Sequence, residues 1–552
     1  MAATVLTILI CVACGQIYRP VVIPINNIPP SPGDFHAVFS LNTNAVYGLN
    51  PDPNNPGNLI PTLVYGPGSA MQIDVGGDAD VGIATLVDGT VSGANPTNGV
   101  SLPNFSRVFV ASAGSAVANG LDAISSFVPT TQSATSSGIG ATSVVSYPNF
   151  IPNPTPNSPD FFCPYLPDFV AASQNITVYV ANYGVENPTN CNLTSTDSIS
   201  VVNAATNVIT NIVYSNPGST PPVVLSHPVA MAQVQTPNGN KLYVLNQGNN
   251  TVSSFYTVDM TPTTATGMVA GFTGTTPAWV TARGDGQQVY VLSQGDGQLW
   301  TIDAATDAVI GSVSVGAGAN YVLYDPNLNR LYVTNPNNSS AYIFSVAGNL
   351  PSLIKTIVLG SGAIGNYPAC SNACPTSVAA LPDGTEAYIA SYQLIGGAGC
   401  TDPIPQSLTA PPACSVTASV TVLDALSTTV TSTISAFPSG ATSVPEVANC
   451  LPANANGLYN PGLVPVPGTS ASRFAARFRV SAVAAADSSR VYVSVCDAGS
   501  VAIINTTDGN TNNPGQNIPD DTLVLDLATP FGIGTTSNSL PQQNPIFLFR
   551  GQ

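Results

Sequence analysis

Short apolar runs of β-branched and aromatic residues, separated by polar turns, recur along most of the chain. The stretch NRLYVTNPNN at 329–338 places a polar turn, a short strand and a second polar turn within ten positions. Such runs, bounded by turn residues, are typical of β-strands. Related stretches are RVFVAS at 107, TVYVAN at 177, KLYVLN at 241, QVYVLS at 288, RLYVTN at 330, EAYIAS at 386 and RVYVSV at 490.

The seven copies share one aromatic residue, which follows an aliphatic residue or Ala and precedes Val or Ile. The intervals from Tyr243 to Tyr290 and from Tyr290 to Tyr332 are 47 and 42 residues. These intervals fit one four-stranded propeller blade, and the longer intervals fit a blade with inserted loops. The repeated aromatic residues are Phe109, Tyr179, Tyr243, Tyr290, Tyr332, Tyr388 and Tyr492.

Turn signals flank the repeated strand on both sides. Gly and Asn before it supply the positive φ angles of tight hairpins, as in TPNGN at 236 and LPDGT at 381. After several copies a further strand ends at Asn203, Asp303 or Asp424, where a side-chain oxygen can close the turn into a fourth strand. Each blade is therefore predicted to have four antiparallel strands.

The pattern predicts an all-β fold, a seven-bladed β-propeller of four-stranded antiparallel blades. A blade cannot bury both of its faces alone, so the blades stack and the ring closes. Strands near 36–75 and at the C-terminus lie outside the seven copies, and we expect one end of the chain to complete a blade supplied mainly by the other. The predicted organisation is a signal segment at 1–14, a Pro-rich linker at 15–35 and one propeller domain at 36–552, with long insertions near 115–170, 392–416 and 437–475.

The YVTN at 332–335, with TIDAATDAVIGSVSV upstream, resembles the YVTN family of β-propeller repeats. The similarity covers roughly residues 100 to 510, is strongest from 228 to 359 and is absent from the insertions. Proteins of this family are bacterial and archaeal surface or exported proteins, so the resemblance implies export as well as the propeller fold.

Charged residues make up only 7% of the chain, and the formal net charge is −17. Lys241 and Lys355 are the only lysines, so a phosphate backbone would be repelled and nucleic acid is excluded as a partner. Together with 48 Gly and 49 Pro, this composition favours a turn-rich β protein over a disordered acidic one. The scarcity of charge also suits an acidic, extracytoplasmic setting, for which we expect stability to change little between about pH 3 and pH 7.

The N-terminus, MAATVLTILICVACGQIYRP, resembles the signal peptide of a bacterial lipoprotein. A short apolar run ends at Ala13 and is followed by Cys14, the expected lipidated residue. Two features depart from the pattern: no basic residue precedes the run, and Cys11 stands where Leu is usual. A start codon placed too far downstream would explain the missing charge. The alternatives to a lipoprotein signal are a buried N-terminal strand and an uncleaved anchor.

Without Cys11 and Cys14, eight of the ten cysteines remain, an even number as a disulfide framework in an oxidising compartment requires. Connectivity does not follow from sequence, but pairing between neighbours would close each polar insertion. A zinc site at CSNAC is the competing interpretation, and it lacks a second closely spaced pair. The expected pairs are Cys163 with Cys191, Cys370 with Cys374, Cys400 with Cys414, and Cys450 with Cys496.

Several further motifs have ordinary structural explanations. The RGD at 283–285 occupies a hairpin position, and Asp78 with Asp80 lacks the other ligands of a calcium loop. We expect the basic residues Arg473, Arg477 and Arg479 to lead into a strand. Trp279 and Trp300 are expected to pack between blades, and a quinone-binding role for them would rest on fold analogy alone. In a chain so rich in Asn, Ser and Thr many glycosylation sequons arise by chance, and in a bacterial protein we expect no glycan on them. They lie at Asn104, Asn175, Asn192, Asn249, Asn337, Asn338 and Asn505.

Catalysis would need a positioned base, and His36 and His227 are the only histidines. We expect both to be structural or exposed, and we predict no catalytic residue, cofactor or metal. The leading hypothesis is an exported, lipid-anchored surface propeller that binds a protein or an envelope polysaccharide through its inserted loops. The alternatives are an enzyme resembling lactonases or quinoprotein dehydrogenases, and a structural subunit of a surface lattice or filament.

Overall fold

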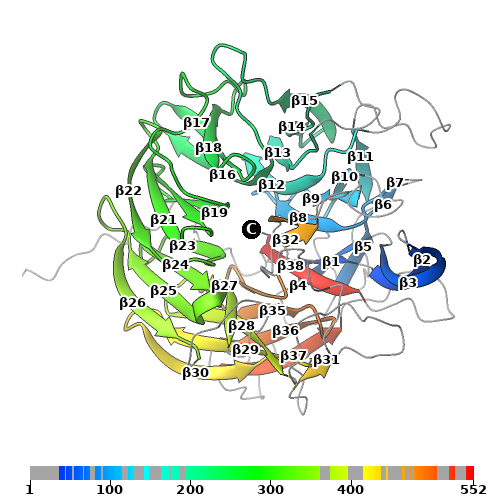
Figure 1. Ribbon diagram of the computed structural model, residues 1–552. Coiled ribbons are helices and arrows are strands. Elements are labelled where there is room, and N and C mark those ends of the chain that lie inside the picture. Colours follow the sequence, from blue (N-terminus) through cyan, green and yellow to red (C-terminus); the bar gives the residue numbers. More distant parts are fainter. Residues whose placement is uncertain are drawn as a thin grey trace, which may run out of the picture. The chain divides into compact units, whose positions relative to one another are not determined.

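Eight antiparallel sheets follow one another around a ring in the computed structural model of the protein (Figure 1). All described residues lie in one unit, His36–Gln552. Within them no helix is long and apolar enough to span a membrane. The described residues are 37–43, 45–52, 55–65, 68–74, 81–88, 91–114, 122–129, 142–147, 163–173, 176–186, 193–360, 373–395, 415–436, 443–445, 450, 463–465, 472–474, 478–506, 521–528 and 543–551.

We number the sheets as blades 1 to 8 around the ring and give their strands from the centre outward. Blade 1 contains β38 (Asn544–Arg550), β1 (Ala37–Thr43), β4 (Ser69–Asp74) and β5 (Val81–Thr85). Blade 2 contains β8 (Pro96–Ser101), β9 (Val108–Ser112), β10 (Ala123–Phe127) and β11 (Ser143–Ser146). Blade 3 contains β12 (Pro167–Ser173), β13 (Thr177–Asn182), β14 (Ser198–Asn203) and β15 (Val208–Tyr214). Blade 4 contains β16 (Pro228–Thr236), β17 (Gly239–Asn246) and β18 (Thr251–Tyr256).

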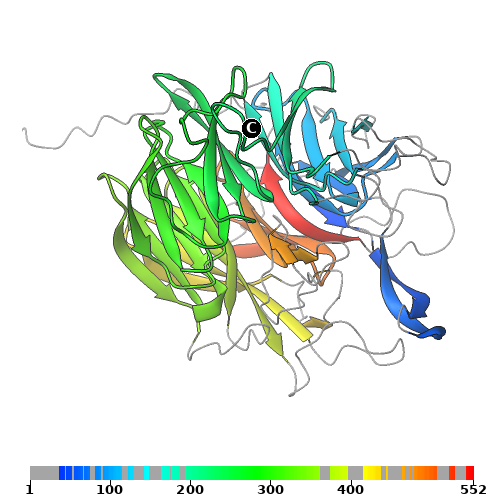
Figure 2. The same ribbon diagram turned by 45° about the horizontal axis from the view of Figure 1, so that its top comes forward.

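The second half of the ring continues the same order, as the tilted view also shows (Figure 2). Blade 5 contains β19 (Pro277–Ala282), β20 (Gln288–Ser293), β21 (Gln298–Asp303) and β22 (Ala308–Ser314). Blade 6 contains β23 (Tyr321–Asp325), β24 (Arg330–Asn335), β25 (Ser340–Ser345) and β26 (Ser352–Val358), with the 3₁₀ turn η2 (Pro336–Asn338) after β24. Blade 7 contains β27 (Cys374–Ala380), β28 (Glu386–Ile395), β29 (Ser415–Asp424) and β30 (Thr429–Ser435), and β31 (Val444–Pro445) also pairs with β29. Blade 8 contains β34 (Val480–Ala484), β35 (Arg490–Val495), β36 (Ser500–Asn505) and β37 (Thr522–Ala528).

Three two-stranded hairpins lie outside the blades. They are β2 (Ala45–Asp52) with β3 (Asn55–Tyr65), β6 (Val87–Asp88) with β7 (Val91–Ser92), and β32 (Leu463–Pro465) with β33 (Ser472–Phe474).

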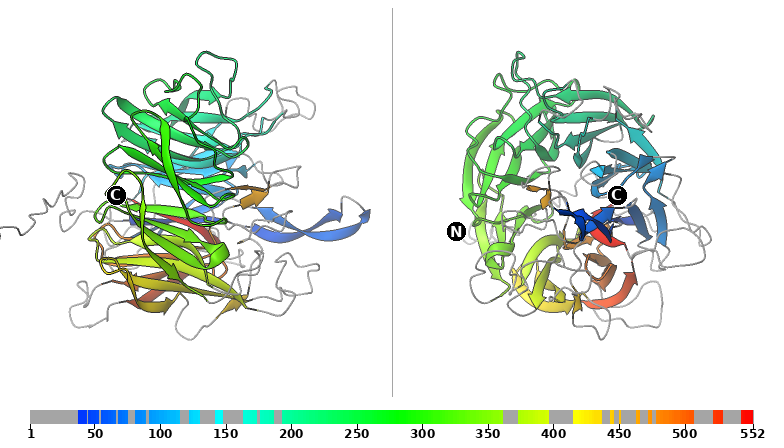
Figure 3. Two further views of the ribbon diagram at one scale, coloured as in Figure 1. Left: turned by 60° about the vertical axis from the view of Figure 1, so that its left-hand side comes forward. Right: turned by 45° about the vertical axis from the view of Figure 1, so that its right-hand side comes forward.

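The ring closes because the innermost strand of every blade contacts that of the next (Figure 3). The last link is made by the two ends of the chain, since β38 pairs with β1 and Phe549 lies opposite Phe39. One terminus thus completes a blade supplied mainly by the other, as the unassigned end strands predicted. This closure leaves no blade with an unpacked face.

The prediction of seven blades is wrong, because the ring has eight. The seven repeated aromatic residues lie in the second strands of blades 2 to 8. The eighth copy is Phe39-Ser40-Leu41-Asn42 in β1, which keeps the aromatic residue and the Asn three positions later. It was missed because Ser40 replaces Val or Ile, and because its blade takes an innermost strand from the far end of the chain.

The segment 115–170, predicted as an insertion, contains β10, β11 and the start of β12, which belong to blades 2 and 3, and much of the rest lies outside the described residues. Glycine and turn residues are spread throughout this region, so its short strands give no clear strand pattern in the sequence. Residues 396–414 lie between β28 and β29, outside the described residues. Residues 437–475 lie between β30 and β34 and contain the short strands β31, β32 and β33.

The repeated aromatic side chains are buried between neighbouring sheets. Tyr332 of blade 6 is 1% exposed and packs with Val378 and Ile389 of blade 7. Fully burying an aromatic side chain of this kind contributes roughly 1.5–3 kcal/mol. The turns between third and fourth strands close as predicted, because Asn203 and Asp303 each accept two backbone N–H hydrogen bonds at 2.9 Å, and Asp424 accepts one from Ser427 at 2.7 Å.

Candidate functional site

Strand direction gives the ring two faces that carry different kinds of connection. We call the linker face the side on which second strands end and the next blade begins. We call the turn face the side that carries the hairpins between first and second strands. The connections containing 396–414 and 437–475 join strands at the linker face, so this face carries the longest interruptions of the repeat.

In blades 4 and 6 the last residue of the repeat motif is an Asn that holds the preceding linker. Asn335 is fully buried and its Nδ2 donates to the carbonyls of Val315 and Gly316, both at 2.8 Å. These carbonyls belong to the linker from blade 5. Asn246 reaches Val224 in the linker before blade 4 in the same way, at 3.5 Å. These two amides therefore tie a blade to the linker before it and are not available to a ligand.

Aromatic side chains from blades that are not neighbours meet at the centre of the ring. Trp279 of blade 5 lies 5.8 Å from Phe169 of blade 3, 4.9 Å from Tyr321 of blade 6 and 5.7 Å from Phe478, which precedes blade 8. Phe478 in turn lies 6.0 Å from Phe547 of blade 1. We call these five residues the axial aromatic cluster. Ring centroid distances of 4.5–7 Å are those of favourable aromatic pairs.

The two tryptophans were predicted to pack between blades. Trp279, 8% exposed, packs against aromatic rings of blades 3 and 6, as expected. Trp300, half-buried on β21, packs 5.4 Å from Phe272 just before blade 5. Within the axial cluster, burial alone raises the pKa of Tyr321 to about 12. This hydroxyl therefore stays protonated at physiological pH.

Among the described residues of the linker face, His227 is the side chain best placed to act as a general base. Its Nδ1 lies 2.8 Å from the carbonyl oxygen of Tyr183 and 3.1 Å from Oδ1 of Asp197. Both partners are acceptors, so Nδ1 carries a hydrogen and Nε2 is the basic nitrogen of the neutral ring. The ring stacks on Tyr183 at 4.4 Å, and 23% of the side chain is exposed.

The electrostatics of His227 favour its charged form. Burial lowers the pKa of His227, but the hydrogen bond and the charge of Asp197 outweigh burial, and the net shift is upward. The backbone of Gly184, with φ +72°, lies so close to Asp197 that any side chain at this position would overlap the carboxylate. The pair is therefore an oriented acid–base dyad, although the pattern LSHPVA alone did not reveal the distant Asp197.

The backbone of His227 has a positive φ of 47°, which by itself would suggest strain at a functional site. The same conformation recurs before the first proline of other blades, so it belongs to the repeat. In each case a bulge follows the proline in the innermost strand. The equivalent residues are Asn95 (φ 53°), Leu166 (φ 52°) and Thr276 (φ 50°).

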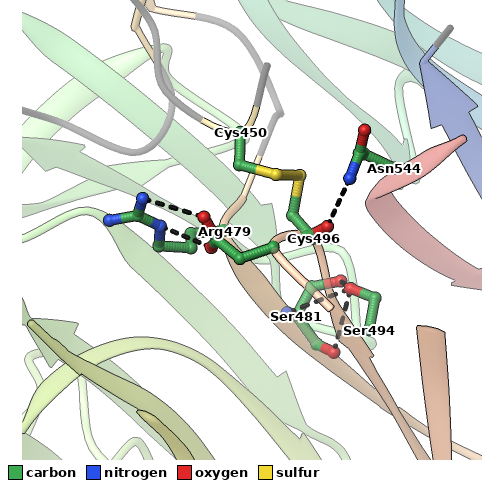
Figure 4. Close-up of a disulfide and its surroundings, with 7 residues drawn as sticks. Cys450, Arg479, Ser481, Ser494, Cys496 and Asn544 are labelled. Atoms are coloured by element: carbon green, nitrogen blue, oxygen red, sulfur yellow. Dashed lines mark hydrogen bonds and ion pairs between the residues drawn. A yellow bond between two sulfur atoms is a disulfide. The ribbon is translucent and has the colours of Figure 1, made fainter. Parts of the chain in front are cut away.

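A disulfide and a buried ion pair secure the linker that enters blade 8 (Figure 4). Cys450 and Cys496 are bonded, which is the pairing expected for these two residues. Beside them Arg479 donates to both carboxylate oxygens of Asp497, at 2.7 and 3.0 Å, and lies 5.1 Å from the ring of Tyr392. Of the predicted basic cluster, Arg479 thus has a structural role, whereas Arg477 and the side chain of Arg473 lie outside the described residues.

Cys163 and Cys374 also form disulfides. A zinc site at CSNAC would need the thiolate of Cys374, which the disulfide removes. The lipidation candidate Cys14 lies outside the described residues, and the remaining cysteines Cys191, Cys370, Cys400 and Cys414 do too.

The other candidate motifs have local explanations where they are described. In the RGD turn, Arg283 pairs with Asp285 at 2.8 Å, so the motif is folded back on itself. The possible calcium ligands Asp78 and Asp80 and the second histidine, His36, lie outside the described residues. Within the described ranges no group of three or more His, Cys, Asp or Glu side chains could hold a metal ion.

No protein-family model and no curated protein matches the chain. Similar solved structures include a putative 6-phosphogluconolactonase of Bacteroides uniformis, with 12% identity, 72% of this chain and 95% of that chain covered, and a TM-score of 0.41. The periplasmic gluconolactonase of Pseudomonas aeruginosa has 14% identity, coverage of 74% and 96%, and a TM-score of 0.43. Hydrazine synthase of Kuenenia stuttgartiensis has 16% identity, coverage of 66% and 87%, and a TM-score of 0.39. Identities and scores this low carry no argument about function, and the YVTN similarity stays a resemblance.

Proposed function

We propose that the protein is an exported, lipid-anchored β-propeller that binds a surface protein or an envelope polysaccharide through the loops of its linker face. The axial aromatic cluster carries this proposal. Five aromatic side chains meet where the innermost strands converge, and they supply packing rather than acid–base groups. The rigid ring then serves to present loops, which is how binding loops on stable scaffolds work.

Disulfides support the exported location. The Cys450–Cys496 bond, together with disulfides at Cys163 and Cys374, suits an oxidising compartment. Mass spectrometry of the mature protein from the cell envelope tests the anchor. The expected product begins at a lipid-modified Cys14, whereas an intact Met1 or an unmodified Cys14 would contradict it.

Binding through the linker face is tested by exchanging one connection on each face for a Gly-Ser linker. The linker-face variant replaces 396–414, which removes Cys400 and Cys414 together. The turn-face control replaces 508–519, between β36 and β37. We expect only the first variant to lose binding to isolated envelopes, and protease or periodate treatment of the envelopes distinguishes a protein from a polysaccharide partner. Equal binding by both variants would refute the assignment.

The dyad of His227 and Asp197 favours a second candidate, hydrolysis of an ester or lactone with His227 as general base. A positioned base contributes typically 10²–10⁴-fold to a rate. Under this hypothesis His227→Asn abolishes turnover of a lactone panel, and Asp197→Asn reduces it strongly by releasing the ring from its tautomer. If wild-type protein turns over no lactone above the buffer rate, this candidate is excluded for that substrate class.

A further inference from the structure

In three successive seams, the residue two positions before the repeated aromatic residue reaches across to the next blade. Between blades 4 and 5, Lys241 binds Asp307 at 2.7 Å, and the hydroxyl of Tyr243 donates to the same carboxylate at 2.5 Å. Lys241 also donates to the carbonyl of Ala304 at 2.7 Å. This seam therefore combines one carboxylate, one ammonium group and one phenol hydroxyl.

The next two seams use the same position with other donors. Between blades 5 and 6, the amide of Gln288 donates to the carbonyl of Asn349 at 2.9 Å and accepts from the hydroxyl of Tyr290 at 2.7 Å. Between blades 6 and 7, Arg330 donates to the carbonyl of Leu426 at 3.3 Å. In all three seams the position supplies a hydrogen-bond donor to the turn of the neighbouring blade.

The seam between blades 7 and 8 breaks this rule, because Glu386 occupies the position. The hydroxyl of Tyr388 lies 2.6 Å from Oε2 of Glu386 and 2.9 Å from Oδ1 of Asp521. Ser432 of blade 7 also donates to Asp521, at 3.3 Å. Two carboxyl groups from different blades thus approach one phenol oxygen.

The two contacts to the Tyr388 oxygen need one hydrogen more than the phenol supplies. A phenol has one hydrogen to donate, and ionised carboxylates are acceptors only. With both carboxylates ionised, one of the two short contacts to the Tyr388 oxygen has no hydrogen. One additional proton, on either carboxyl, completes both hydrogen bonds. Burial and both carboxylates raise the pKa of Tyr388, so the phenol itself does not release its hydrogen.

Further charged groups lie near this seam. Asp424 is the cross-strand neighbour of Glu386, and the charge of Arg330 from blade 6 acts on Asp424. Arg490 lies on β35 of blade 8, whose Tyr492 belongs to a buried cluster shared with blade 1.

We propose that the seam between blades 7 and 8 is a pH-sensitive latch, in which Glu386, Tyr388 and Asp521 share one additional proton and hold the two blades together more tightly in acid. Two carboxyl groups that share a site have one strongly raised pKa, and the pair titrates as a unit. The folded pair then binds a proton that the unfolded chain has already released. Its stabilising effect is complete below the unfolded pKa values, about 4, and is lost as the pH rises through the folded value.

Hydrogen exchange of the intact, oxidised protein tests the latch locally. At each pH, wild-type protein is compared with Glu386→Gln, which places in blade 7 the residue that blade 5 uses. In wild-type protein we expect the equilibrium constant for opening of β28–β30 and β35–β37 to increase as the pH rises. The total increase should be about tenfold for each unit by which folding raises the pKa of the pair. In Glu386→Gln the dependence between about pH 4 and pH 8 should disappear. The strands of blade 2 serve as the internal control.

Infrared spectroscopy provides the second measurement. Near pH 6 the folded wild-type protein should show the carbonyl band of a protonated carboxyl that both Glu386→Gln and Asp521→Asn remove. Asp521→Asn acts from the opposite blade and keeps the test open if Glu386→Gln does not fold. Equal pH dependence of wild-type protein and both variants, or the absence of this band from wild-type protein, would overturn the proposal.

Discussion

Replacing Lys241 by Met tests whether the seams between blades are held by dry ion pairs. Lys241 is 2% and Asp307 4% exposed, and their charged atoms are 2.7 Å apart. At an effective dielectric constant of about 20, charges at this distance attract by roughly 6 kcal/mol. Several kcal/mol of this is offset by desolvation of the two ions, but removing one partner leaves the other buried and uncompensated. We expect Lys241→Met to lower the free energy of unfolding by about 3–5 kcal/mol.

The other lysine supplies a matched control. Lys355 is exposed on the outer strand β26, so Lys355→Met should change the free energy of unfolding by no more than about 0.5 kcal/mol. The double variant Lys241→Met with Asp307→Asn removes both charges and should recover most of the loss. Urea unfolding followed by fluorescence measures all four proteins. A loss below about 1 kcal/mol for Lys241→Met would show that water reaches the pair and would refute the reasoning.

Three further predictions follow from the same seams and linkers. Asn335→Ala should cost about 1–3 kcal/mol in urea unfolding, because two buried linker carbonyls lose their donor; an unchanged midpoint would contradict this. Protonated His227 should stabilise the folded state fully below about pH 6.5, and this stabilisation should be lost as the pH rises through the raised folded pKa of His227. His227→Asn should therefore reduce the pH dependence of hydrogen exchange in blades 3 and 4 and leave that of blades 7 and 8 unchanged. Replacing both Cys450 and Cys496 by Ser opens a loop with a sequence separation of 46 and should cost up to about 4 kcal/mol, whereas equal stability of reduced and oxidised protein would refute it.

Local patterns were sufficient for the repeated strands, their turns and the propeller ring, because each depends on residues close together in the chain, whereas the short strands β10 and β11 were not recognised. Tyr332 predicted a buried strand, and Asp303 predicted the turn that its side chain closes. The number of blades was not predictable in this way. Phe39 lies in a weak copy of the motif, and its blade is completed by β38, more than 500 residues further along the chain.

The sequence by itself determined the propeller architecture, the low charge and the cysteine content of this protein, since composition and short-range periodicity carry them. Only the tertiary structure decided which side chains meet. Trp279 reaches Phe478 across the axis, Asp197 orients His227 from 30 positions away, and Asp521 faces Glu386 from the next blade. The physical reason is that ring closure sets these distances, and no local pattern records which blades a closed ring brings together.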